Sequence, residues 1–107
     1  MSGLSFDLVA ENRREESVHP CTVFVAAPVV RGGAWVTFIT WKGFAARPIK
    51  GYGATSLQSL RLALDIFDMI LEEHSEEWAF SQDGQPFHVP GVPKHDRVGS
   101  SPGRPEA

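Results

Sequence analysis

The chain has 107 residues and a mass of 11.8 kDa, which is enough for one domain and too little for two. A hydrophobic fraction of 42% excludes a wholly disordered chain. No stretch reaches the roughly 18 uncharged apolar residues that a membrane span requires. The first residues lack the pattern of a secretory signal, and a single cysteine excludes an internal disulfide. We therefore expect a cytoplasmic protein that has no membrane partner.

The formal charge of −3 is distributed unevenly along the chain. Residues 1–54 carry a net +2, residues 55–90 a net −6, and residues 91–107 a net +1. Because the overall charge is negative, long-range attraction to a polyanion is weak. The sequence therefore predicts that nucleic acid is not a partner.

Two strands joined by a charged loop are predicted at the start of the chain. Residues 4–10 alternate apolar and polar side chains, which is the period of a strand with one buried face. The charged run 12–17 predicts a hairpin loop, and residues 21–30 are rich in β-branched side chains. Pro28 has no N–H to donate, so it indicates a bulge or an edge in the second strand. A tight turn at 31–33 follows, because it holds two glycines.

The third predicted strand, residues 34–44, is apolar on both of its faces. One face carries Ala34, Val36 and Phe38, and the other carries Trp35, Ile39 and Trp41. A strand with one face in water does not show this pattern. A short fourth strand is predicted within 45–52, where Pro48 favours an edge position.

A helix that begins after Thr55 is the strongest prediction. Thr55 and Gln58 have the spacing of a capping box, in which side chains satisfy free backbone N–H groups of the first turn. Its main apolar stripe follows the i, i+3, i+4, i+7 spacing through Leu57, Leu60, Leu64, Phe67 and Leu71. Further apolar residues widen the arc beyond half of the circumference. We expect the apolar surface of the helix that the sheet does not cover to be covered by the later part of the chain or by another protein.

The predicted fold class is α+β: an antiparallel sheet of three to four strands packed by one long helix, followed by a short irregular segment. The aromatic residues within 78–89 indicate an irregular hairpin that folds back over the helix. Residues 1–90 form the predicted domain. Residues 91–107 contain three glycines and three prolines, which favours a disordered tail.

The helix start resembles a known sequence pattern. Residues 53–64 read G-A-T-S-L-Q-S-L-R-L-A-L, which is similar to the G-x-x-S-L-Q-x-L-x-L-A-L segment of a family of small uncharacterised bacterial proteins, a domain of unknown function. The resemblance extends over roughly residues 5–75. It implies the fold class and a bacterial source, and it supplies no catalytic residues.

Three groups of residues could carry chemistry, and each has a simpler structural explanation. His19 and Cys21 lie on one face of a strand, but a lone cysteine in an apolar strand is usually a small core residue. Gly51 and Gly53 before the helix could bind an anion, although glycines also serve to turn a strand into a helix. The third group is acidic and surrounds His74: Glu72, Glu73, Glu76 and Glu77. Because there is no second histidine at helical spacing, this group is more typical of a solvated helix end than of a metal site.

These acids face the negative end of the helix dipole, so a compensating basic surface is expected. Lys42, Arg47 and Lys50 could supply it within the chain or across a dimer. We predict no catalytic residue, no metal and no cofactor.

The leading hypothesis is therefore a non-enzymatic interaction module that self-associates as a homodimer. Its predicted interface anchors are Trp35, Trp41, Phe67 and Met69.

The alternative hypothesis is a small acidic protein, like an immunity protein or an antitoxin, that binds a cationic partner. Its predicted acidic strip consists of Asp65, Asp68, Glu72, Glu76 and Glu77. An enzyme or small-ligand binder that uses His19 and Cys21 or the cluster around His74 ranks third.

Overall fold

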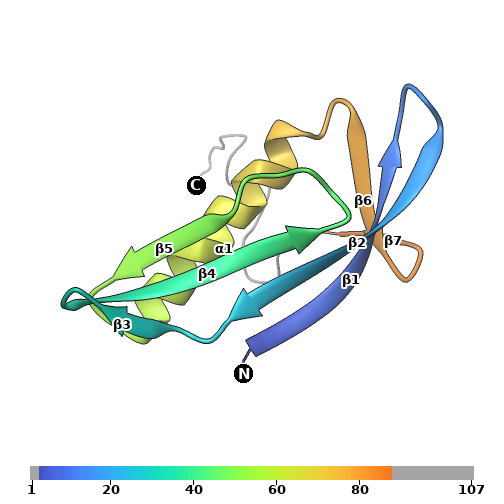
Figure 1. The fold of residues 1–107 in the computed structure, drawn as a ribbon. Coiled ribbons are helices and arrows are strands. Elements are labelled where there is room, and N and C mark those ends of the chain that lie inside the picture. Colours follow the sequence, from blue (N-terminus) through green and yellow to red (C-terminus); the bar gives the residue numbers. More distant parts are fainter. Residues whose placement is uncertain (1–2, 88–107) are drawn as a thin grey trace, which may run out of the picture.

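In the computed structural model, which describes residues 3–87, seven strands form one antiparallel sheet and a single helix lies across one of its faces (Figure 1). The elements in chain order are β1 (Gly3–Asn12), β2 (Ser17–Ala26), β3 (Val29–Arg31), β4 (Ala34–Lys42), β5 (Ile49–Gly53), α1 (Ser56–Glu73), β6 (Trp78–Gln82) and β7 (Gln85–Pro86). The α+β class is confirmed, and the sheet is larger than the predicted three to four strands. The predicted tail, 91–107, lies outside the described residues.

The second predicted strand is interrupted, and β2 and β3 follow each other along the same side of β4. Val25 pairs with Ile39, whereas Val29 pairs with Val36. Three residues of the first chain segment therefore lie opposite two residues of β4, which is the count of a β-bulge. Pro28 lies within this interruption, where no ladder hydrogen bond is required of it. Of the two outcomes predicted at Pro28, a bulge or an edge, the register shows the extra residue of a bulge.

The capping of α1 follows the sequence pattern with one difference. The Thr55 hydroxyl accepts a hydrogen bond from the Gln58 N–H at 3.1 Å, as predicted. The Gln58 side chain accepts a hydrogen bond from the N–H of Ala54 at 3.0 Å, one residue before the position of an ordinary capping box. The first turn of the helix is thereby tied to the end of β5.

The helix packs very closely on the sheet because β5 carries glycine where it passes under α1. A Cβ atom built on Gly51 would lie 2.5 Å from the Ala63 nitrogen and 2.6 Å from the Ser59 carbonyl oxygen. Beside this contact, the buried hydroxyls of Ser59 and Thr37 are hydrogen-bonded at 2.8 Å. The glycines before the helix therefore allow close packing of α1 on β5, beyond turning the chain.

Residues 78–86 form a hairpin of β6 and β7, as predicted. Because β6 is added to the sheet beside β1, the prediction that this segment folds back over the helix is wrong for most of its length. Strand β6 pairs with β1, with Phe80 opposite Ala10. Phe87, the last described residue, packs against the helix, where its ring lies 6.2 Å from that of Phe67. Register with β1 satisfies the backbone of β6, which an irregular segment over a helix would leave unpaired.

Candidate interaction surfaces

The two faces of the sheet are distinguished by what β4 contacts. Thr37 is hydrogen-bonded to Ser59 of α1, and the Trp41 ring packs 4.9 Å from the Phe67 ring. Odd-numbered residues of β4 therefore face the helix, and even-numbered residues point to the opposite side. We call that opposite side the outer face. No helix or loop of the described residues 3–87 is seen to cover it (Figure 1).

The outer face is apolar and aromatic at its centre. Val36 is fully buried and lies between Val29 and Tyr52 on the neighbouring strands. Phe38 is half-buried, and the Arg31 guanidinium lies 5.3 Å from its ring centre. Phe24 of β2 lies on the same face. β4 is apolar on both sides because one side packs against the helix and the other side forms the apolar centre of the outer face.

Charge is divided across the outer face. Asp7, Thr22 and Lys42 form one row across three neighbouring strands, since Thr22 pairs with both of the other two. The Thr22 hydroxyl donates to an Asp7 carboxylate oxygen at 2.9 Å, which places both on the same face. One side of the row is therefore acidic and the other side is basic. The next row has Phe24 at its centre, between Ser5 and Thr40.

The predicted interface anchors do not share one surface. Phe67 is only 1% exposed and Trp41 is half-buried against it, so both belong to the core beneath the helix. Trp35 is half-buried on the same side of β4, whereas Met69 is 50% exposed on α1. The assignment of Phe67 to an interface is therefore wrong. The packing of the helix turned the Trp41 side of β4 inward.

The predicted acidic strip is also divided by the structure. Asp68 is only 1% exposed and Asp65 is half-buried, whereas Glu72, Glu76 and Glu77 are exposed. Asp68 is therefore not part of an exposed strip. It lies one helical turn after Leu64.

One cation and one amide engage acidic residues at and just beyond the end of α1. Arg47 forms an ion pair with Glu73 at 3.1 Å, and the Glu77 carboxylate accepts a hydrogen bond from Asn12. The hydrogen bond from Arg47 lowers the pKa of Glu73 below its usual value. Of the expected compensating cations, Arg47 thus acts within the chain.

His19 and Cys21 do not form a nucleophile pair. Cys21 is buried on the helix side of β2, whereas His19 is exposed, hydrogen-bonded to Ser17 and packed edge-on against Trp78. Burial raises the pKa of the Cys21 thiol, and the negative charge of Asp7 raises it further. Since the thiolate is the reactive form, both effects disfavour nucleophilic chemistry at this residue.

We expect Cys21 to be modified by a thiol reagent only when the domain opens. At pH 8 the native protein should react at least 100-fold more slowly than the urea-unfolded protein, because the thiol is buried and its raised pKa keeps it protonated. Absorbance assays with a chromogenic disulfide measure both rates. Equal rates would show that Cys21 is accessible in the folded protein and would contradict the conclusion that it is not a nucleophile.

The remaining candidates for chemistry gain no support from geometry. His74 caps the end of α1 and packs edge-on against Phe44. Between residues 3 and 87, no three His, Cys, Asp or Glu side chains gather closely enough to hold a metal ion. Gly51 and Gly53 face α1 rather than an open anion site.

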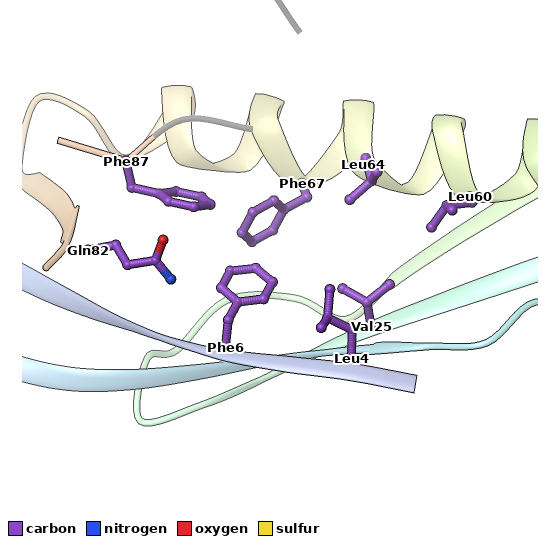
Figure 2. A pocket seen from close by; sticks show the side chains of 8 residues that line it. All are labelled: Leu4, Phe6, Val25, Leu60, Leu64, Phe67, Gln82 and Phe87. Carbon is purple, nitrogen blue, oxygen red and sulfur yellow. The ribbon is translucent and has the colours of Figure 1, made fainter. Parts of the chain in front are cut away.

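A groove opens on the helix side of the sheet, between α1 and the first half of β1. Its volume is about 430 Å³. Figure 2 shows the rings of Phe6, Phe67 and Phe87 converging on it, with aliphatic side chains of sheet and helix at the other end. Its lining is apolar except for one amide: Leu4, Phe6, Val25, Leu60, Leu64, Phe67, Gln82 and Phe87. A chain segment or ligand that enters it would be held by burial of apolar surface.

Sequence reasoning missed both the groove and the division of charge on the outer face. The groove joins residues more than 80 positions apart, and the row of Asp7, Thr22 and Lys42 depends on strand register. The one available signal was the apolar pattern on both faces of β4. It indicated more apolar surface than one helix can cover, but it did not identify which face of β4 stays uncovered by the helix.

Among residues 3–87, no helix is both long enough and apolar enough to cross a membrane. Comparisons with protein-family models, with curated proteins and with solved structures found no match. The resemblance of residues 53–64 to a bacterial family therefore stays a prediction.

Proposed function

We propose that this protein is a self-associating interaction module whose two copies pack outer face against outer face. The observation that carries the proposal is the row of Asp7, Thr22 and Lys42 beside an uncovered aromatic centre. The exposed apolar residues of α1, such as Leu62 and Met69, are separated by charged side chains and make a poorer surface.

A two-fold symmetric dimer would pair the charges in the row of Asp7, Thr22 and Lys42. In a face-to-face dimer the two-fold axis lies between the sheets, and an axis along β2 exchanges the positions of β1 and β4. Strands in a sheet are about 4.8 Å apart, so β1 and β4 lie at matching distances on either side of β2. Asp7 of each copy then faces Lys42 of its partner. Two ion pairs form per dimer, and no like charges meet in this row.

The centre of the same dimer is apolar. Phe24 lies on the axis and faces its own copy, and Phe38 lies two residues along β4 from Thr40, the pairing partner of Phe24. Aromatic side chains of this kind supply large buried areas at the centre of interfaces, while charged pairs at the rim fix orientation. Two sheets packed with aligned strands form an ordinary sandwich. The proposed dimer therefore satisfies both the apolar and the charged residues of the outer face.

A charge exchange tests this arrangement. Wild-type protein should behave as a dimer in sedimentation velocity and light scattering. Lys42→Asp should raise the Kd of the dimer at least tenfold, because each new carboxylate faces Asp7 of the partner. The double variant Asp7→Lys with Lys42→Asp should restore most of the affinity. Arg14→Asp, which makes the same charge change in the exposed hairpin loop, should leave the Kd unchanged.

Phe24→Asp should give folded monomers, as checked by circular dichroism. A wild-type protein that stays monomeric at high concentration would overturn the proposal and favour the alternative, binding of a cationic partner to the exposed Glu72, Glu76 and Glu77. A dimer whose Kd responds equally to Lys42→Asp and Arg14→Asp would overturn the proposed geometry.

A further inference from the structure

We infer that the edge of β5 that faces away from β4 is a docking site for an extended acidic peptide of another protein, which adds to the sheet as a further strand. This edge is separate from the outer face. Two sheets that pack face against face leave their side edges open, so the peptide can bind whether or not the proposed dimer forms. The two proposals can therefore fail independently.

β5 is an edge strand within the described part of the chain. It pairs with residues 35–39 of β4, whereas β2 and β3 pair with β4 from the other side. Among residues 3–87, no strand pairs with the far side of β5, which is the outermost strand on this side of the sheet (Figure 1). Alternate residues of Ile49–Gly53 direct their N–H and C=O groups to that side. An extended peptide can hydrogen-bond to these groups, as in β-augmentation.

The helix directs one of its flanks past this edge. α1 lies directly over β5, because a Cβ atom built on Gly51 would lie 2.5 Å from the Ala63 nitrogen. Leu60 and Leu64 line the groove toward β1, on one flank of α1. The opposite flank of α1 therefore lies beyond β5, above the position that an added strand would take.

The flank of α1 beyond β5 is apolar along most of its length. One stripe there follows intervals of four, three and four residues and consists of Leu62, Ile66, Met69 and Glu73. Glu73 is ion-paired with Arg47, which places the end of the stripe beside the start of β5. Leu62 is 42% exposed and Met69 is 50% exposed. By themselves they make a poor surface, but every second side chain of a strand added to β5 would pack against them.

The outer side of the same edge is basic. Lys50 and Tyr52 are exposed on the outer face, where they pair with Phe38 and Val36 of β4. Residues 17–64, which include β2 to β5, contain no Asp or Glu but five basic residues: Arg31, Lys42, Arg47, Lys50 and Arg61. The acidic residues of α1 lie on the helix side of the sheet. A carboxylate of an added strand, placed next to Lys50, would therefore form a cross-strand ion pair.

A second copy of the chain fits this edge poorly. Neighbouring strands are about 4.8 Å apart, and α1 lies directly over β5 in each copy. Pairing of two β5 edges would bring the two helices to a similar distance, whereas packed helices need about 8–10 Å between their axes. A peptide that brings no helix of its own avoids this clash. The expected occupant is therefore a single extended segment that alternates acidic and apolar side chains.

Peptide binding to the full-length chain tests the inference. The probe is a fluorescein-labelled peptide of four Glu-Val repeats, whose anisotropy gives a Kd. We expect saturable binding, with a Kd at least tenfold lower than that of a matching peptide of four Lys-Val repeats. A peptide of the same composition in the order Glu-Glu-Val-Val should also bind at least tenfold more weakly, because its side chains do not alternate between the two sides of a strand. Equal affinity for the three peptides, or no binding of any, would overturn the inference.

Variants on the two sides of the edge locate the site. Lys50→Glu and Leu62→Asp should each raise the Kd of the Glu-Val peptide at least tenfold, and both side chains are exposed, so the variants should fold as checked by circular dichroism. Val18→Asp, which changes an exposed apolar residue elsewhere, should leave this Kd within about twofold. Lys42→Asp should do the same while it weakens the proposed dimer, which separates failure of one proposal from failure of the other. A Kd that does not respond to Lys50→Glu and Leu62→Asp would contradict the site.

Hydrogen exchange tests the added strand itself. At saturation with the Glu-Val peptide, exchange of the β5 amides that point away from β4 should slow at least tenfold, whereas exchange in the hairpin loop 13–16 should not change. Binding without protection of β5 would overturn the inference. A labelled oligothymidylate that binds with the same dependence on Lys50 would assign the edge to a polyanion instead. Loss of self-association in Lys50→Glu would assign it to a second copy, and either result would overturn the peptide site.

Discussion

Phe67→Ala is expected to lower the free energy of unfolding by about 4 kcal/mol, as measured by urea denaturation. Phe67 is 1% exposed and is the point at which three parts of the chain meet the helix. Its ring lies 4.9 Å from that of Trp41 and 6.2 Å from those of Phe6 and Phe87. Truncation removes the burial of the ring and leaves a cavity between α1, β4 and β1. A domain of this size has only about 5–15 kcal/mol to lose, so the variant should be close to unfolding at 37 °C.

Met69→Ala is the matched control, because Met69 lies two residues further along the same helix and is 50% exposed. We expect it to change the free energy of unfolding by less than about 0.5 kcal/mol. Both residues were predicted from the sequence to be interface anchors, so the pair separates core from surface. Similar costs for the two variants would mean that Met69 is covered in solution by another molecule.

Gly51→Ala is expected to lower the free energy of unfolding by about 3 kcal/mol. The added methyl group would lie 2.5 Å from the backbone nitrogen of Ala63 and 2.8 Å from its Cα atom. Since these are backbone atoms of α1, no change of rotamer can relieve the contact. The helix would have to move away from β5, which would also stretch the buried hydrogen bond between Ser59 and Thr37.

Lys50→Ala, at the neighbouring position of β5, controls for the effect of alanine in this strand, because its side chain is exposed on the outer face. It should cost less than about 1 kcal/mol in the same denaturation assay. If Gly51→Ala were as mild as Lys50→Ala, the close approach of helix and strand would not exist in solution.

Local patterns in the sequence were sufficient to predict part of the secondary structure. The alternation in 4–10, the two glycines at 32–33 and the Thr55 cap each concern groups within a few residues of one another. Each led to a confirmed element: β1, the turn between β3 and β4, and α1. Pro28 likewise indicated a bulge or an edge at its position, because the missing N–H is a property of that residue alone.

The sites could not be read in the same way, because they depend on which elements lie next to each other. The apolar pattern of β4 indicated that each of its faces is buried within the chain or available to a partner. The position of α1 determines that Trp41 faces the helix and that Phe38 faces away from it. The short apolar stretch of Trp78–Gln82 was equally suited to packing over a helix and to pairing beside β1. Local hydrophobicity does not distinguish these two outcomes.

The α+β class, the helix with its cap and the turn between β3 and β4 could be predicted from the amino-acid sequence, since these follow from backbone propensities and short-range spacing. The folded chain was needed to show that Asp7, Thr22 and Lys42 share a row, that Asp68 is buried, and that the groove at Phe87 joins the two ends of the described chain. Register and packing are set by the whole core at once, so residues distant in sequence acquire a common surface only when the sheet has formed.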